Sequence, residues 1–282
     1  MEFSFPLRVL RTCQAITKDE REKASSGQPL RSSRDVTFLR NLSDGSQERS
    51  SLDAIYSSHI SCVVTGYDQW RWTGALLAED WFEIPSDNPG PDAVKRYEND
   101  FDDGLLSDPL TRGRQDVYRS SWYPRSYFLH SLQVRLAQAY DEWSVLLLHV
   151  EGIINEASKK HRMLVRQTLV LVREQQPGPQ QQGLLQSLDD FEDKVSDAEE
   201  LLRDLEQVLG ETLKSLSSFM GTDAQYFLGD EPHFTGDFLR YLAQIRQTCN
   251  ALALLQLKYQ GLQEKCKYML KDGNALRKKV HT

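Results

Sequence analysis

The sequence lacks the long apolar runs and the catalytic motifs that most directly indicate function. Its longest apolar stretches, such as VLLLHV at 145–150, fall far short of the roughly 20 residues that a membrane span requires. It also contains no HExxH, no Walker A loop, no GxGxxG and no GxSxG. We therefore expect no membrane span within these 282 residues and no enzyme activity.

Cysteine is scarce, and the first residues lack the features of a leader. The four cysteines (Cys13, Cys62, Cys249 and Cys266) are widely separated and form no CxxC, which predicts free thiols in a reducing, intracellular setting. The start, MEFSFPLRVLRT, lacks a basic region followed by an apolar block, so we expect no secretory signal. A net charge of −7 disfavours nucleic acid as a partner. The sequence thus predicts a cytoplasmic protein.

Helical periodicity is the strongest positive signal. From Pro124 to about residue 172, apolar side chains recur at alternating steps of three and four residues. After Pro124, Gly152 is the only residue in this stretch that disfavours a helix. This spacing is typical of one continuous helical seam, and proline is tolerated in the first turn. Such a helix would be about 70 Å long and would need long partner helices to cover its apolar stripe. The seam comprises Phe128, Leu132, Leu136, Ala139, Trp143, Leu146, Val150, Ile153 and Ala157.

Two further segments, at about 184–219 and 237–275, carry seams of the same kind. The first has ten acidic and three basic side chains, a net charge of −7, whereas residues 237–282 have nine basic and three acidic ones, a net charge of +6. The segment QQPGPQQQG at 175–183 contains two prolines and two glycines and should separate the first two helices. Complementary charge and a short connection predict antiparallel packing of the second and third helices.

The residues before the first long helix are predicted to form two parts. Residues 1–51 resemble a variable, partly disordered segment, in which LRVLRTCQAI is either a short strand or a helix. Residues 52–123 are predicted to form a small Trp-rich α/β part, in which HISCVVTG at 59–66 is a strand. The connector at 84–123 carries an acidic cluster that lacks the spacing of a calcium loop, so we interpret it as solvated. That cluster is Asp100, Asp102, Asp103 and Asp108.

Aromatic residues gather just after the predicted strand, in YDQWRWTGALLAEDWF. Because aromatic side chains bury the most area per residue, we interpret Trp70, Trp72 and Trp81 as core residues, with ligand stacking as the alternative. His130 and His149 lie on the first long helix without carboxylate or cysteine partners at metal-ligand spacing. We interpret both histidines as core or surface residues.

The order of motifs resembles a known family. YDQWRWTG with a following DWF, then DPLTRGR, then PRSYFLHSLQVRLAQAYDEW resembles the cytoplasmic region of the divergent CorA-like magnesium transporters of fungi. The resemblance covers the layout of residues 52–282, and its specific motifs cover 67–143. The family carries a Pro-Arg-x-Tyr-Phe-Leu start followed by an arginine and a Glu-Trp pair. The matching positions are Pro124, Arg125, Tyr127, Phe128, Leu129, Arg135, Glu142 and Trp143.

The resemblance implies a cytoplasmic α/β domain followed by long helices, with an acidic helical pair beside a basic stalk helix that leads to the first of two membrane spans. It also implies a Gly-Met-Asn motif at the pore entrance and a pentamer. This sequence contains neither that motif nor a span, so we expect it not to conduct ions alone. A truncated product, a fragment and a soluble paralogue are all consistent with this. The basic end at Arg277, Lys278 and Lys279 would suit the cytoplasmic face of a membrane.

The leading hypothesis is therefore the cytoplasmic domain of a CorA-like divalent metal transporter. Its expected fold is α+β and predominantly helical, with a long antiparallel, coiled-coil-like three-helix bundle at 124–282 (helices at about 126–173, 184–219 and 237–275). The acidic second helix could bind Mg²⁺ weakly, because carboxylates suit hard cations, but a solvated helix face is the alternative. The rival hypothesis is a coiled-coil interaction or scaffold protein without a metal role. An apolar stripe left exposed after the helices pack would favour that rival.

Overall fold

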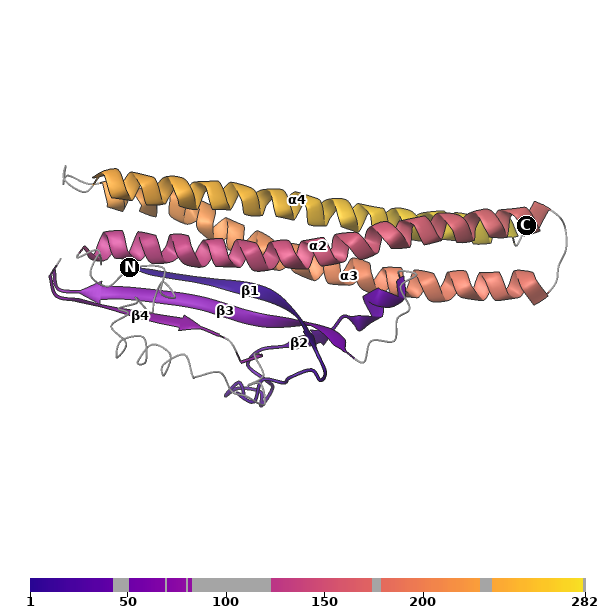
Figure 1. Cartoon of the computed structure of the whole chain (residues 1–282), viewed down its shortest axis with the longest axis horizontal. Coiled ribbons are helices and arrows are strands. Elements are labelled where there is room, and N and C mark those ends of the chain that lie inside the picture. The colour runs from indigo at the N-terminus through magenta and orange to yellow at the C-terminus, as the bar shows by residue number, and fades with distance from the viewer. Residues whose placement is uncertain are drawn as a thin grey trace.

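The computed structural model is mostly helical, with a small antiparallel sheet in its N-terminal part and three long helices. The predicted α+β, predominantly helical class is therefore confirmed. The helices lie together along one side of the sheet and extend beyond it at one end (Figure 1). The residues that the structure describes are 1–42, 51–68, 70–79, 81–82, 123–173, 179–228 and 235–280.

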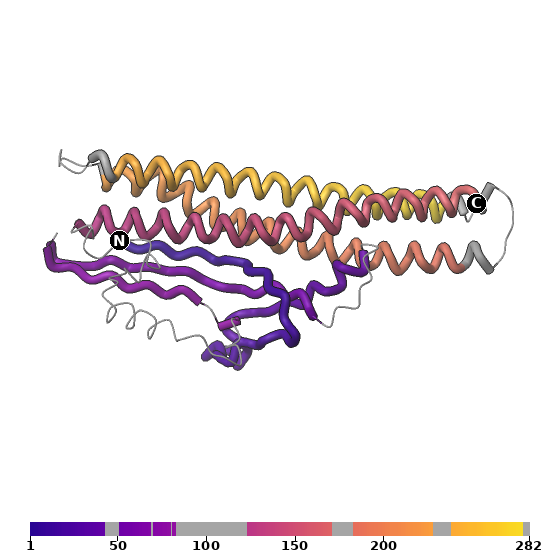
Figure 2. The backbone as a smooth tube through the Cα atoms, in the orientation of Figure 1, coloured from indigo at the N-terminus to yellow at the C-terminus, as the bar shows by residue number. Residues whose placement is uncertain are grey.

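The sheet is organised around one long strand, β3, which pairs with all three of the others. One edge of β3 is covered along its length by β1, with Phe5 opposite Ile60. The other edge is shared, because β2 pairs with the first half of β3 and β4 with the second half. The strand nearest the helices is β1 (Figures 1 and 2). The bounds are Glu2–Cys13 for β1, Ser33–Asp35 for β2, Leu52–Gly66 for β3 and Trp72–Ala78 for β4.

The N-terminal part differs from the prediction of a variable, partly disordered segment at 1–51. Residues 2–13 form β1, so the open choice between strand and helix for LRVLRTCQAI is settled as strand through Cys13. Apolar and polar residues alternate along β1 with the period of two that a half-buried strand requires. The short 3₁₀ helix η1 (Thr37–Leu42) also joins the core. The buried apolar residues of this part include Phe5, Leu7, Val9, Val36, Leu39 and Leu42.

The predicted strand at 59–66 is confirmed and is longer than expected, since β3 begins at Leu52. The three predicted long helices are also present. Helix α2 and helix α4 run in the same direction and α3 runs against them (Figure 1). The break between the first two helices is shorter than predicted, because Pro179 occupies the first turn of α3, where its missing N–H costs nothing. The bounds are Pro124–Arg173 for α2, Pro179–Gly221 for α3, Asp223–Leu228 for the 3₁₀ helix η4 and Thr235–Val280 for α4.

The apolar seams pack between the helices and against the sheet. On α2, Trp143 is 1% exposed, and its ring lies edge-on to Tyr259 of α4 at a centroid distance of 6.0 Å. The Tyr259 hydroxyl also donates to the carbonyl oxygen of Trp143 at 3.3 Å. Further along α2, burial moves from the predicted Ile153 to Ile154. A straight helix with 3.6 residues per turn drifts from a strict seven-residue repeat in this way.

Candidate functional site

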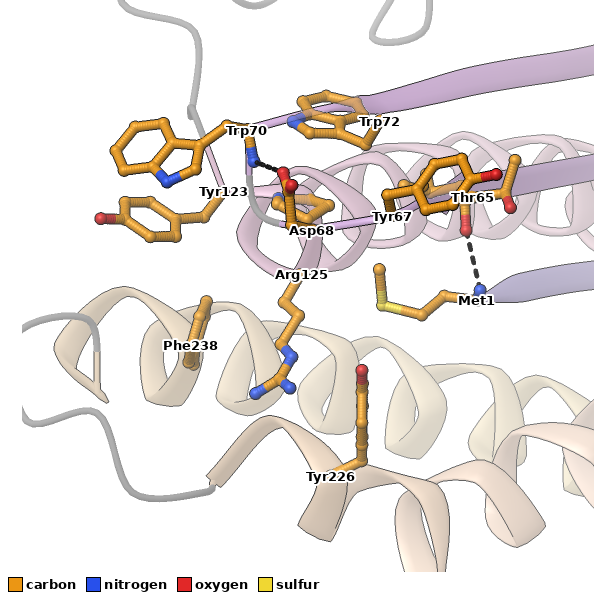
Figure 3. A pocket seen from close by; sticks show the side chains of 13 residues that line it. Met1, Thr65, Tyr67, Asp68, Trp70, Trp72, Tyr123, Arg125, Tyr226 and Phe238 are labelled. Atoms are coloured by element: carbon orange, nitrogen blue, oxygen red, sulfur yellow. Dashed lines mark hydrogen bonds between the residues drawn. The ribbon is translucent and has the colours of Figure 1, made fainter.

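A cavity of about 630 Å³ lies where the turn between β3 and β4 meets the first turn of α2 (Figure 3). Five parts of the chain contribute to its wall: the first residue, the β3–β4 turn with the strand ends beside it, the start of α2, η4 and the start of α4. We call this cavity the aromatic pocket. Its aromatic lining residues are Tyr67, Trp70, Trp72, Tyr123, Tyr226 and Phe238.

The turn between β3 and β4 is fixed by a glycine and an aspartate. A Cβ atom at Gly66 would lie 2.5 Å from the carbonyl oxygen of Arg71, so a larger residue would push the two strands apart. The Asp68 carboxylate accepts hydrogen bonds from the backbone N–H groups of Trp70 and Arg71 at 2.8 and 2.9 Å. The Arg71 guanidinium donates to the other Asp68 oxygen, and its hydrogen bonds hold the pKa of Asp68 below the ordinary value.

The aromatic side chains at the tip of this turn are open to solvent. Trp70 is 67% exposed and lies 6.3 Å from the ring of Tyr123, and Tyr67 is 96% exposed. The interpretation of Trp70 as a core residue is therefore wrong. Asp68 holds the backbone of Trp70 in the turn. The Trp70 side chain therefore has no apolar core beside it in which to pack.

The other two tryptophans of the Trp-rich stretch are partly buried against the core, as predicted. Trp72 packs on the buried ring of Tyr127 at a centroid distance of 5.1 Å. Trp81 donates its indole N–H to the carbonyl oxygen of Ser57 at 3.1 Å. Both residues are therefore structural, and Trp72 is also part of the pocket wall.

Arg125 brings a cationic group to the aromatic pocket. Its guanidinium carbon lies 4.2 Å from the centre of the Tyr226 ring, an arrangement in which the ring face attracts the cation. Figure 3 shows the side chain extending from α2 towards Tyr226 and Phe238. Among the described residues, no carboxylate forms an ion pair with Arg125, whereas Asp68 in the same wall is paired with Arg71.

The positions on which the CorA-like resemblance rests divide between this pocket and the helix interfaces. Pro124 and Arg125 line the pocket, and Tyr127 packs on Trp72 beside it. Phe128, Leu129 and Trp143 are core residues with no more than 1% exposure.

Of the two polar residues in the middle of the motif, Glu142 holds α2 against the sheet. Glu142 accepts two hydrogen bonds from the Arg11 guanidinium of β1, both at 2.9 Å. Arg135 is 2% exposed and donates to Gln138 at 3.1 Å on the same helix. Most of the motif therefore specifies how α2 packs, and only its first residues reach an open cavity.

A separate polar cluster surrounds Asp53 in the first half of β3. Its carboxylate, which is 2% exposed, accepts hydrogen bonds from Arg40 at 2.5 Å and from the Thr12 hydroxyl at 2.8 Å. Burial raises the pKa of Asp53, but these hydrogen bonds outweigh it and hold the pKa below the ordinary value. His149 of α2 lies 3.7 Å away, so tertiary packing gives it the carboxylate neighbour that the sequence did not show. The cluster joins β1, η1, β3 and α2.

A third polar cluster lies among the helices, in the C-terminal parts of α2 and α4. Glu192 of α3 is 5% exposed and binds the Arg277 guanidinium of α4, and burial raises its pKa. His161 of α2 is 1% exposed and stacks on Phe191, and burial lowers its pKa. Glu192 fits here because Gly273 of α4 has no side chain. The predicted attraction between acidic α3 and basic α4 is thus realised at Arg277.

The described residues contain no group of three or more His, Cys, Asp or Glu side chains that could hold a metal ion. The acidic cluster from Asp100 to Asp108 and the DPLTRGR motif lie outside the described residues. Cys13, Cys249 and Cys266 are free thiols, and burial raises the pKa of Cys266 to about 12. No helix in the part that the structure describes is long and apolar enough to cross a membrane.

Comparisons with protein-family models, curated proteins and solved structures find no significant match.

Proposed function

We propose that this chain is an assembly domain, in which long helices join copies of the chain through an apolar stripe on α4. The observation that carries the proposal is that this stripe stays uncovered after the three helices have packed. Leu254, Leu257 and Tyr268 are 61%, 62% and 67% exposed. Scattered exposed apolar residues are normal, but several on one helix face typically mark a contact surface.

The face that carries these residues follows α4 at steps of three and four residues, the spacing of a coiled-coil seam, and includes the polar residues Arg246, Asn250 and Glu264. It lies opposite the buried seam that contains Tyr259 and Cys266. All of its nine positions are exposed. We call this set the α4 stripe, which comprises Leu239, Ala243, Arg246, Asn250, Leu254, Leu257, Gly261, Glu264 and Tyr268.

A second copy of the chain is the proposed occupant of the α4 stripe. Gly261 lies within it and has no atom within 4 Å of a Cβ position, although glycine costs a helix interior about 1 kcal/mol relative to alanine. A close approach by another helix would explain a glycine there. The opposite net charges of the α3 and α4 sequences also favour contact between neighbouring copies.

We further propose that this assembly domain is of the CorA-like cytoplasmic type, with α2, α3 and α4 as a coiled-coil-like bundle. The order of elements supports this, since the sheet is followed by α2, then by the acidic α3 and then by the basic α4. The C-terminal end of α4 also points away from the sheet (Figure 1). In a CorA-like arrangement, α4 would be the stalk of a pentamer and its basic end would face anionic lipid.

The rival proposal is a coiled-coil interaction or scaffold protein without a metal role, and the α4 stripe favours it equally. The CorA-like proposal and the scaffold proposal differ in the response to Mg²⁺ that they predict. The described residues form no metal cluster, so Mg²⁺ dependence, if present, would arise from assembly or from residues outside the described part. A Mg²⁺-dependent rise in melting temperature or in oligomer mass, compared with KCl at equal ionic strength, favours the CorA-like type. Assembly that is indifferent to Mg²⁺ favours the scaffold.

The assembly itself is tested by the mass of the full chain, measured by sedimentation velocity over a range of concentrations. We expect an oligomer, and we expect L254K/L257K to reduce its mass to that of a monomer, because lysine cannot be buried in a seam without a partner. The matched control is V145K/L148K on α2, where the native side chains are 54% and 66% exposed. A monomeric wild-type chain, or equal loss of mass in both double variants, would overturn the proposal.

A further inference from the structure

The aromatic pocket has the size and the wall of a small-molecule site. Its volume of about 630 Å³ lies within the range of about 300–1,000 Å³ that is usual for ligand pockets. Trp70 and Tyr67 line it and are 67% and 96% exposed. Exposed ring faces stack well on other planar groups, because every aromatic ring offers a π-face. The wall therefore suits a planar ligand.

The positive charge of the described wall indicates a second property of the ligand, which is an anionic group. Arg125 has no ion-pair partner among the described residues, and its guanidinium carbon is held 4.2 Å from the centre of the Tyr226 ring. A guanidinium held in this way binds phosphate or carboxylate through two parallel hydrogen bonds. The first turn of α2 contains no acidic side chain, so its N-terminal N–H groups would also favour an anion.

From these observations we propose that the aromatic pocket binds a small planar anion, an aromatic ring that carries a phosphate or a carboxylate. The ring stacks on Trp70 or Tyr67, and the anionic group binds Arg125. A long nucleic acid is disfavoured, because it needs a basic groove along several phosphates and this chain has a net charge of −7. This proposal does not depend on the assembly through the α4 stripe.

Isothermal titration calorimetry of the full chain tests the ligand class with four probes. Adenosine monophosphate and indole-3-acetate carry both a ring and an anion, whereas adenosine and inorganic phosphate carry one each. We expect one or both of the first two to bind, at least about tenfold more tightly than either single-feature probe, which corresponds to about 1.4 kcal/mol. Preference for the nucleotide identifies a phosphate ligand, and preference for indole-3-acetate a carboxylate. Binding of adenosine as tightly as of its monophosphate, or binding of no probe, overturns the proposal.

Two substitutions then separate the roles of the ring and the cation. R125Q should weaken the anionic probe at least about tenfold and leave adenosine unchanged, and R125K should recover part of the loss, because it restores charge without the planar fork. W70A should weaken both probes, because a stacked base contributes about 1–3 kcal/mol. The controls are R166Q and M163A, at exposed residues of α2. Equal effects of R125Q and R166Q would overturn the assignment, and circular dichroism checks that each variant is folded.

Discussion

Alanine at Gly273 would place a methyl group where the Glu192 carboxylate lies. An ideal Cβ atom at this position of α4 would be 1.7 Å from Oε1 of Glu192 and 2.6 Å from its Cδ. The carboxylate is held there by Arg277, which also binds Asp189 at 2.9 Å. Because the methyl group and the carboxylate cannot share this space, G273A must displace the Glu192 side chain from its buried position.

Two effects of opposite sign determine how G273A changes the free energy of unfolding. Alanine stabilises a helix interior by about 1 kcal/mol relative to glycine. Breaking a buried ion pair costs about 3–5 kcal/mol, and the lower end applies here because the Arg277 side chain is 36% exposed and keeps Asp189 as a partner. We therefore expect G273A to lower the free energy of unfolding by about 2 kcal/mol, the difference of these two effects.

Urea unfolding followed by circular dichroism measures this change. The matched control is G152A on α2, where no atom lies within 4 Å of the Cβ position, so alanine should raise the free energy of unfolding by about 0.5–1 kcal/mol. In an E192A background the obstacle is gone, so G273A should stabilise by a similar amount. If G273A has the same effect in both backgrounds to within about 0.5 kcal/mol, the steric argument is refuted.

The two other buried polar clusters give further predictions. R40M leaves the Asp53 carboxylate buried without its main partner and should lower the free energy of unfolding by about 3 kcal/mol. R40M/D53N should be more stable than R40M in urea unfolding, and a double variant that is less stable would contradict this. Burial lowers the folded-state pKa of His161, so stability should fall as the pH drops through about 6.5, the pKa of an unfolded histidine. H161Q should therefore show a smaller loss of unfolding free energy between pH 7 and pH 5, and an unchanged loss would contradict the role of His161.

The helices could be predicted from sequence because a helical seam is a local signal. Apolar steps of three and four residues fix which side of a helix is buried, whatever the partner. The drift from Ile153 to Ile154 on α2 could not be predicted, because it depends on where α4 and the sheet lie. Charge counts likewise predicted that α3 and α4 would attract each other, but not that Gly273 would admit Glu192.

The sheet was less predictable, because its signals are weaker and its pairing is not local. The alternation in β1 is present in the sequence, but Pro6 and the reversed order of Leu10 and Arg11 obscure it. Its arginines are accommodated by contacts far away in the chain: Arg11 binds Glu142, and Arg8 donates to Ser57 at 2.5 Å. A strand whose charged residues need tertiary partners cannot be told from a helix until those partners are known.

The aromatic pocket could not be assembled from sequence, because its wall comes from five separate parts of the chain. Trp70 was noticed for its residue type, but its exposure follows from the turn that Gly66 and Asp68 hold. Arg125 was noticed as part of a family motif, and its place over Tyr226 depends on η4, which follows α3 in the chain. The composition of a stretch can suggest stacking, but only packing decides which ring faces stay open.

The α4 stripe presents a different case, since its spacing is present in the sequence alongside that of the buried seam. Tyr259 and Leu262 belong to the buried seam, while Leu254 and Leu257 repeat the same three-and-four spacing on the opposite side. A single amphipathic helix needs one apolar side, and a helix between two partners needs two. Since α2 and α3 contact α4 and leave Leu254 and Leu257 exposed, we propose that a second copy of the chain covers this side.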